Sequence, residues 1–267
     1  MSTSLRDRFY AEGRLPDCPI YDLHGHWGPH PAIHLPAADP AIARPLLDQA
    51  NVRRLVLCHH YTLFTPDIGN RINIDTVRAM PDILRAYMGI NPNHPDETAR
   101  DLATFDRYPD VFVGFKLLAD YHRIKVGDDR NRAVWEFANA RRLPVLLHTW
   151  GGSAFDGYDA VREVAERYPE ARIICGHSIH GDWDHAVELA RNFPNLYQEL
   201  TAVPDERGPV ERLIEGAGSK KIIFGTDFPW FSHAYYVGAL LGAGVDDESL
   251  RDILYRNAQR ILGEPAH

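Results

Sequence analysis

The feature that most constrains the fold is a series of eight short apolar runs that recur along the chain. Most runs are continuous rather than alternating, which is typical of parallel strands covered on both faces. Each run is bounded by turn or breaker residues. We therefore predict eight strands, at Ile20–His24, Arg54–His59, Ala86–Asn91, Val111–Leu117, Pro144–Thr149, Arg172–His177, Asn195–Thr201 and Lys221–Asp227.

Helical spacing fills several of the stretches between these runs. The clearest case is the last one, where apolar residues recur from Leu250 to Leu262, between a capping aspartate at Asp246 or Asp247 and a stop at Gly263. Strands and helices alternate at intervals of roughly 25 to 35 residues, which predicts a closed (β/α)8 TIM barrel. The 267 residues suit one such domain, spanning 1–267.

An open doubly wound sheet is the main alternative fold. It would normally carry a glycine-rich phosphate loop after its first strand, and the sequence has none. The most irregular stretch instead runs from Trp27 to about Pro40 and is rich in Pro, His and Ala. We expect this stretch to fold over the top of the barrel.

Charge and composition exclude several classes of function. The formal net charge is -8, and the 29 Lys and Arg are scattered, so we expect neither nucleic-acid nor membrane binding. The three cysteines are unpaired by spacing, and Cys58 and Cys175 lie in apolar runs, which indicates buried free thiols. No apolar run approaches the roughly 18 residues of a membrane span. We expect a soluble, cytoplasmic protein.

Ligand-type side chains fall at the carboxyl ends of the predicted strands. In a parallel barrel these ends meet on one face, where barrel enzymes carry out their chemistry. The two imidazoles of a His-x-His on an extended segment point to the same side and can reach one ion. The side chains concerned are His24, His26, Lys116, His148, His177 and Asp227.

Each of these residues also has a plain structural interpretation. A lone His148 or His177 is more often a hydrogen-bonded core histidine than a ligand. Asp227 could simply cap the turn in Gly-Thr-Asp-Phe-Pro. Their joint occurrence at strand ends predicts a metal site formed by His24, His26, His148, His177 and Asp227.

The sequence resembles the amidohydrolase superfamily, and within it the amidohydrolase-related branch that includes metal-dependent hydrolases and decarboxylases. The resemblance covers nearly the whole chain. It rests on motifs at strands one, four, five, six and eight and on the closing helix: Asp22-Leu23-His24-Gly25-His26, Gly114-Phe115-Lys116-Leu117, Leu147-His148-Thr149, Cys175-Gly176-His177, Phe224-Gly225-Thr226-Asp227-Phe228-Pro229 and Arg256-Asn257-Ala258-Gln259-Arg260-Ile261-Leu262.

The resemblance implies one of two metal arrangements. In binuclear members, a strand-four lysine is carboxylated and bridges two ions, because a carbamate is an anionic oxygen ligand whereas an ammonium repels a cation. Lys116 would then lie between an ion on His24, His26 and Asp227 and a second ion on His148 and His177. In mononuclear members, one ion is held by His24, His26, His148 and Asp227. His177 is then an acid or base, and Lys116 contacts substrate or pairs with a carboxylate such as Glu199.

Of the two arrangements, we narrowly favour one tightly held ion. The histidine-rich set predicts Zn²⁺, with Mn²⁺ as the alternative because carboxylate and water ligands suit it too.

The resemblance implies hydrolysis by metal-activated water of an amide, lactone or ester carbonyl, with Asp227, His177 and Lys116 as the catalytic residues. The alternative from the same family is non-oxidative decarboxylation of an aromatic or unsaturated carboxylic acid. An alternative of another class is a catalytically silent barrel that binds metal or ligand.

We expect a small, possibly ring-containing substrate. Aromatic and histidine side chains just beyond the strand ends suggest a wall for a ring, although each could merely pack a loop. Arg71 and Arg123 could meet a substrate carboxylate, but solvated surface positions are the default for both. The candidate wall residues are Trp27, Tyr61, Tyr121, Trp150, Trp230 and His233. A homo-oligomer is possible, but no interface signature is present.

Overall fold

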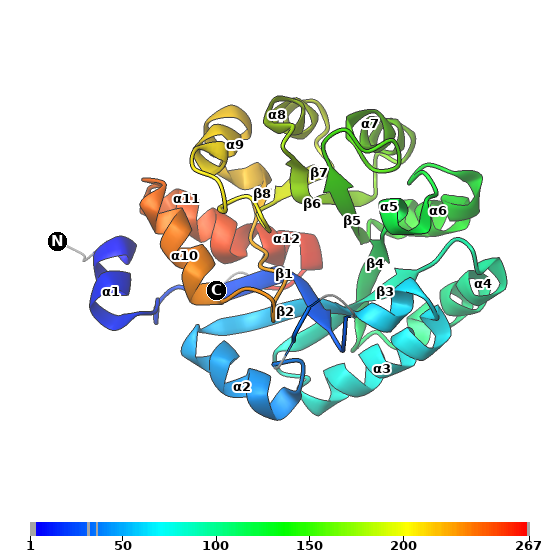
Figure 1. The fold of residues 1–267 in the computed structure, drawn as a ribbon, viewed down its shortest axis with the longest axis horizontal. Helices are drawn as coiled ribbons and strands as arrows, with labels where there is room; N and C mark the ends of the chain where they lie inside the picture. The colour runs from blue at the N-terminus through cyan, green and yellow to red at the C-terminus, as the bar shows by residue number, and fades with distance from the viewer. Residues whose placement is uncertain (1–3, 31–32, 36, 266–267) are drawn as a thin grey trace.

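The computed structural model describes residues 4–30, 33–35 and 37–265, and these form a (β/α)8 barrel (Figure 1). Eight parallel strands pair in chain order, from β1 to β8. The predicted fold class is therefore confirmed. The strands are β1 (Ile20–Trp27), β2 (Val52–His59), β3 (Leu84–Ile90), β4 (Phe112–Leu117), β5 (Pro144–Trp150), β6 (Arg172–His180), β7 (Leu196–Glu199) and β8 (Ile222–Ile223).

The helices surround the strands, as Figure 1 shows, and four of the longer ones begin with a proline that presets the first helical turn. The helices are α1 (Leu5–Glu12), α2 (Pro40–Gln49), α3 (Pro66–Ala79), α4 (Pro95–Thr104), α5 (Ala119–His122), α6 (Arg132–Arg141), α7 (Tyr158–Arg167), α8 (Trp183–Asn192), α9 (Pro209–Ala217), α10 (His233–Gly242), α11 (Asp247–Arg251) and α12 (Asn257–Leu262). Short 3₁₀ segments are η1 (His60–Leu63), η2 (Phe105–Arg107), η3 (Asp129–Asn131) and η4 (Ser219–Lys221). None of the helices within the described ranges is long and apolar enough to cross a bilayer.

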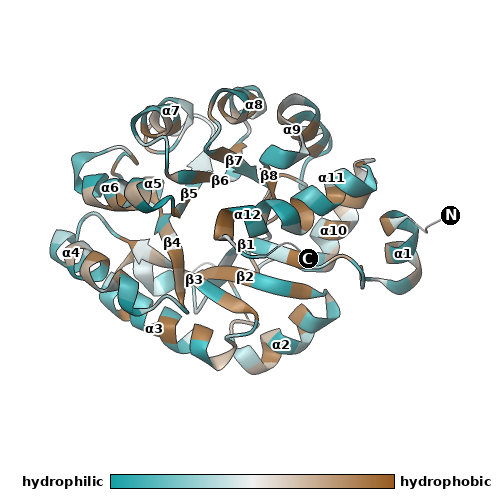
Figure 2. Cartoon of the chain, turned by 180° about the vertical axis from the view of Figure 1, so that it is seen from behind, coloured by the Kyte–Doolittle hydropathy of each residue, from teal (hydrophilic) through white to brown (hydrophobic). Residues whose placement is uncertain are grey.

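The core consists of apolar side chains on the strands and on the inward faces of the helices. Figure 2 shows hydrophobic residues on the strands, whereas hydrophilic residues are prominent on the surrounding helices. The three cysteines, Cys18, Cys58 and Cys175, are buried and free, as the sequence predicts for Cys58 and Cys175. This distribution is expected for a sheet covered by helices on its outer face.

The barrel closes between β8 and β1 through irregular backbone. The predicted strand Lys221–Asp227 is ordered as a strand only at Ile222–Ile223. Beyond it, the Leu23 amide donates to the Phe224 carbonyl at 3.1 Å, and the Asp227 amide donates to the His24 carbonyl at 2.8 Å. The chain leaves the regular ladder here because Asp227 has a left-handed conformation, with φ 55°.

The carboxyl-terminal helix is interrupted by a π segment, η5 (Asp252–Arg256), between α11 and α12. Asp246 caps its start by accepting from the amides of Glu248 and Ser249, and Gly263 ends it with φ 68°. Both ends were predicted, but the π segment was not, because apolar periodicity does not report a one-residue insertion.

The segment between β1 and α2 lies partly outside the described residues. We expect the stretch from Trp27 to about Pro40 to cover the barrel top. Positions 31, 32 and 36 of this stretch lie outside the described residues. Within the described part, the His30 ring lies 5.1 Å from that of His60 and 5.7 Å from that of Trp230.

Gly225 occupies a position where no side chain fits. A Cβ there would lie 2.0 Å from Glu199 Oε1 and 2.8 Å from His24 Cβ, both fully buried. We expect Gly225→Ala to lower the free energy of unfolding by about 3 kcal/mol, because neither neighbour can move without breaking other contacts. Urea unfolding measures this change.

Gly242→Ala is the matched control. Gly242 is the last residue of α10, and a Cβ there meets no atom within 4 Å. The free energy of unfolding should stay the same or rise slightly, because alanine favours the helix. An equal loss in both variants would contradict the packing argument.

Candidate metal centre

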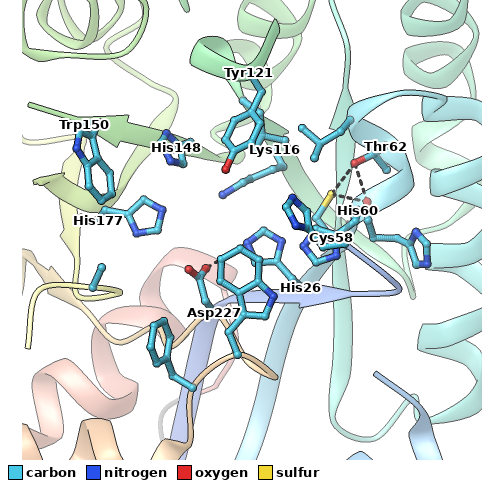
Figure 3. Close-up of a pocket in the computed structure, with 17 residues that line it drawn as sticks. His26, Cys58, His60, Thr62, Lys116, Tyr121, His148, Trp150, His177 and Asp227 are labelled. Carbon is cyan, nitrogen blue, oxygen red and sulfur yellow. Dashed lines mark hydrogen bonds and ion pairs between the residues drawn. The ribbon is translucent and has the colours of Figure 1, made fainter. Parts of the chain in front are cut away.

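The carboxyl ends of β1, β4, β5, β6 and the segment after β8 surround one cavity of about 280 Å³. His26, Lys116, His148, His177 and Asp227 line it. Figure 3 shows the Lys116 amine pointing between His148 and His177 on one side and His26 and Asp227 on the other. His24, from β1, is fully buried behind this lining. The structure therefore brings all six candidate side chains to the same end of the barrel.

Asp227 is the point where the ligand atoms converge. Its Oδ1 lies 3.1 Å from the Nε2 atoms of both His24 and His26, yet it is buried and has no hydrogen-bond partner among the described residues. Donor atoms of His24, His177 and Asp227 all lie within 4.8 Å of one another. Two atoms that each bind one ion at about 2.1 Å lie roughly 3.0 to 3.4 Å apart. The residues present therefore fit a divalent cation.

The histidines are in the state that a metal requires. Burial, followed by the charge of Lys116, lowers the pKa of His24 to about 3. Burial also places the pKa values of His26 and His177 well below the ordinary value. The imidazoles are thus neutral and offer lone pairs, as metal ligands must.

Glu199, the last residue of β7, fixes the orientation of His24. Its Oε2 is 2.7 Å from His24 Nδ1, which leaves Nε2 of the same ring directed toward Asp227. Glu199 also accepts from the His177 amide at 3.2 Å and from the Thr201 amide and hydroxyl at 2.6 and 2.7 Å. A carboxylate that holds the far nitrogen of a metal-binding imidazole is typical of metal sites.

Lys116 has no carboxylate partner. Its Nζ lies 2.8 Å from His24 Nε2, and it forms no ion pair within the ranges that the structure describes. The pairing with Glu199 considered for the one-ion arrangement is therefore absent, because the Glu199 carboxylate is occupied by His24 and Thr201. Burial lowers the pKa of Lys116 to about 8.

An unusual backbone turn positions His177. His177, Ser178 and Ile179 have φ values of 66°, 50° and 52°, all in the left-handed region that non-glycine residues rarely adopt. Thr149 holds this turn by accepting from the Ile179 amide at 2.9 Å and donating to the Gly176 carbonyl at 2.5 Å. The hydrogen bonds of Thr149 thus hold the turn in a strained backbone conformation, as is common at functional sites.

His148 lies next to the other ligand-type residues but outside the tight cluster. Its ring centroid is 4.8 Å from that of His177. Its Nδ1 is 3.5 Å from Asp156 Oδ2, and Asp156 is fully buried. His148 therefore lies next to His177, across the cavity from His26, as Figure 3 shows.

Three of the six candidate wall residues line the cavity: Tyr121, Trp150 and Trp230. The other three lie outside the described lining, so the structure gives no support for substrate contact there. Trp27 is buried at the end of β1, and Tyr61 is 40% exposed. His233 is buried as the first residue of α10, and its Nε2 is 2.8 Å from Asp22 Oδ2.

Arg71 and Arg123 also lie away from the described cavity lining. Arg71 donates to the carbonyl of Asp67, and the Arg123 guanidinium lies 4.5 Å from the Phe155 ring centroid. The default interpretation as surface residues is therefore the better one for both.

The sequence analysis did not identify the contribution of β2 and η1, from which Cys58, His59, His60 and Thr62 line the cavity. His30, after β1, lines it too. The signal was present, because Cys58 and His59 end the second apolar run and His60 follows it, at the same barrel face as the other ligand-type residues.

Glu199→Gln should weaken metal binding 10- to 100-fold, because a neutral amide orients and polarises His24 less well than a carboxylate. Competition with a chromophoric chelator measures the affinity. Glu215→Gln, at an exposed position of α9, is the control and should bind as the wild type does. Equal affinity in all three proteins would show that Glu199 does not support the site.

Comparison with known proteins agrees with this architecture. The chain is similar to an uncharacterized TIM-barrel protein from Bordetella bronchiseptica, with 18% identity, a TM-score of 0.73 and coverage of 86% of this chain and 85% of the other. It is also similar to 5-carboxyvanillate decarboxylase from Sphingomonas paucimobilis, with 15% identity, a TM-score of 0.68 and coverage of 93% and 100%. These identities establish likeness of fold alone.

A third similar structure is a dihydroxybenzoic acid decarboxylase from Polaromonas sp. JS666, with bound manganese and the inhibitor 2-nitroresorcinol. It is 15% identical, with a TM-score of 0.71 and coverage of 92% and 97%. No curated protein sequence matches the chain significantly. The amidohydrolase family profile, however, matches residues 21–263. Nearly the whole chain is included in this match, and the protein therefore belongs to the amidohydrolase family.

Proposed function

We propose that this protein is a metal-dependent hydrolase that cleaves an amide, lactone or ester of a small substrate. The observation that carries the proposal is the position of Lys116, whose amine faces a cation site 2.8 Å from His24 Nε2 and forms no ion pair with a carboxylate among the described residues. An ammonium at this position would repel a divalent cation bound to the neighbouring His24. A carbamate on the same nitrogen would attract it.

The surroundings of Lys116 favour this modification. Burial lowers the pKa of Lys116 to about 8, so an appreciable fraction of the amine is neutral near physiological pH and can add carbon dioxide. A carbamate on Lys116 would provide an anionic oxygen ligand. His24, His26 and Asp227 would hold one ion, and His148 and His177 would hold a second. This revises the preference for a single ion that the sequence alone suggested.

Zn²⁺ is the proposed metal because neutral imidazoles dominate the ligand set. Mn²⁺ is the alternative, supported by the manganese in the similar decarboxylase structure. When bound, such an ion supplies Lewis acidity toward a substrate carbonyl and activates water.

The protein's own groups then move the protons. Asp227 lines the cavity, and its carboxylate can take a proton at the oxygen that does not hold the ion and pass it to the leaving group. His177, held by its left-handed turn, lines the same cavity, and in the one-ion arrangement it would be free to take this proton instead. Both residues touch the reacting atoms in this proposal, so both are catalytic residues.

The cavity suits a small substrate with a ring. Tyr121 and Trp150 flank His148, at ring-centroid distances of 5.4 and 5.9 Å, and Trp230 stacks on His26 at 5.5 Å. The described lining contains no arginine, so a substrate with several negative charges has only Lys116 and the metal to meet it. A compact substrate of low charge fits best.

Decarboxylation of an aromatic acid is the second candidate. It is favoured by the aromatic wall and by the fact that two of the similar structures described above are decarboxylases. The metal ligands do not distinguish the reactions, because either can use the same cation. The fate of water and of carbon dioxide does distinguish them.

Isotope labelling tests the proposed reaction. The metal-loaded protein should be offered small cyclic amides, lactones, esters and hydroxybenzoic acids in ¹⁸O-enriched water. Hydrolysis predicts an acid product that contains ¹⁸O, with no release of carbon dioxide. Release of carbon dioxide would identify the decarboxylase instead. Asp227→Asn should abolish either activity, and its metal-free form should melt at the same temperature as metal-free wild type. No turnover by the wild type would favour a silent barrel.

The Lys116 carbamate can be observed directly. Protein equilibrated with ¹³C-bicarbonate and metal should show a carbamate carbon signal by ¹³C NMR. We expect Lys116→Met to lose this signal and one of the two bound ions. The exposed Lys220→Met is the control and should keep both. A wild-type protein with full activity and no carbamate signal would contradict the bridging role.

A further inference from the structure

Asp156 is a buried carboxylate that the proposed chemistry does not use. It lies in the segment between β5 and α7 and is fully buried, yet it forms no ion pair with a lysine or arginine of the described residues. Its Oδ1 atom is buried without a hydrogen-bond partner in the part of the chain that the structure describes. Burial of a carboxylate with so few partners is costly, because its lost hydration is not replaced. Such a group requires a physical explanation.

The surrounding backbone holds Asp156 in place. The carbonyl of the preceding residue, Phe155, accepts from the Val126 amide at 2.9 Å. The Asp156 side chain in turn accepts, through Oδ2, from the Asp120 amide at 3.1 Å, in α5. The next residue of α5, Tyr121, lines the cavity. Asp156 therefore connects a fixed loop to the helix that carries part of the cavity wall.

His148 has the group that complements this carboxylate. Its Nδ1 is buried, has no hydrogen-bond partner among the described residues, and lies 3.5 Å from Asp156 Oδ2. A hydrogen bond from N–H to a carboxylate is about 2.8 Å long, so a shift of the imidazole by roughly 0.7 Å forms it. Each of the two groups therefore lacks a partner that the other can supply.

The chemistry of the pair determines which nitrogen of His148 carries the proton. A carboxylate can only accept, so Nδ1 must be the donor and the neutral ring keeps its lone pair on Nε2. Nδ1 is buried, whereas the His148 side chain lines the cavity, so Nε2 is the nitrogen that remains for a ligand there. The opposite tautomer would direct an N–H group at a cation.

We propose that Asp156 is a positioning residue that accepts a hydrogen bond from His148 Nδ1 and thereby directs the Nε2 lone pair of His148 toward the metal. The inference rests on the proposed function in that His148 is a metal ligand, which holds for the one-ion and the two-ion arrangement. Asp156 does for His148 what Glu199 does for His24: it sets the tautomer, the ring orientation and the basicity. Asp156 lies outside the described cavity lining, so it acts through His148.

Asp156→Asn separates this role from a structural one. The asparagine carbonyl oxygen can still accept from the Asp120 amide, which preserves the contact with α5. The amide nitrogen that then faces His148 can only donate. His148 Nδ1 would have to accept, so the ring proton would move to Nε2 and occupy the lone pair that a metal needs.

The tautomer can be observed without metal, substrate or turnover. Protein labelled with ¹⁵N-histidine should be studied by long-range ¹H–¹⁵N NMR, which distinguishes the two neutral tautomers. The resonances of His148 are those that are absent from the spectrum of His148→Gln. In metal-free wild type we expect the proton on Nδ1, and in metal-free Asp156→Asn we expect it on Nε2.

Metal affinity gives the second measurement. In competition with a chromophoric chelator, Asp156→Asn should bind the ion held by His148 about 10- to 100-fold more weakly than wild type does. Asp159→Asn is the matched control, because Asp159 is exposed in the first turn of α7 and its replacement removes the same charge. This control should keep the wild-type tautomer and affinity.

A wild-type His148 with its proton on Nε2 would overturn the proposal. An unchanged tautomer in Asp156→Asn would do the same, even with weaker metal binding, because the loss would then reflect altered folding. Unchanged affinity in that variant would also overturn it. The proposed hydrolysis can fail separately. If one ion is found per chain, or if isotope labelling identifies decarboxylation, the expected tautomers and the weaker metal binding of Asp156→Asn should still be present.

Discussion

The contact on which the rest of the site depends is the buried hydrogen bond between Glu199 and His24. Glu199 comes from β7, and its carboxylate joins three elements by accepting from His24 on β1, from the His177 amide on β6 and from Thr201 beyond β7. Gly225 allows this carboxylate to approach the segment that closes the barrel. The same interaction therefore orients a metal ligand and fixes the relative positions of the strands that bear the others.

This arrangement explains how a largely apolar barrel end can present a cation site. Desolvation keeps the imidazoles neutral, so His24, His26 and His177 provide lone pairs rather than charges. Asp227 provides the negative charge, and its left-handed backbone conformation turns it away from the regular ladder. Burial lowers the pKa of Lys116 to about 8, and this is why we place its modification at the centre of the proposed site.

The sequence predicted the barrel and the convergence of the six ligand-type residues, because strand ends in a parallel barrel meet on one face regardless of loop structure. It did not predict the details that depend on packing. Trp27 and His233 follow strand ends just as Trp150 and Trp230 do, and only side-chain direction separates the residues outside the cavity from those that line it. Likewise, the sequence allowed Glu199 to pair with Lys116, whereas in the structure the Glu199 carboxylate hydrogen-bonds to His24. Local backbone conformations, such as the left-handed turn at His177, Ser178 and Ile179, do not alter apolar periodicity, so the sequence pattern does not reveal them.

The central claim is that this cluster is a catalytic metal centre, and metal content per chain tests it most directly. Elemental analysis should use protein purified without chelators and without an affinity metal. We predict close to two ions per chain, retained through dialysis, and loss of one of them when Asp227 is replaced by asparagine. Protein that holds no metal, and takes up none when zinc or manganese is offered, would contradict it.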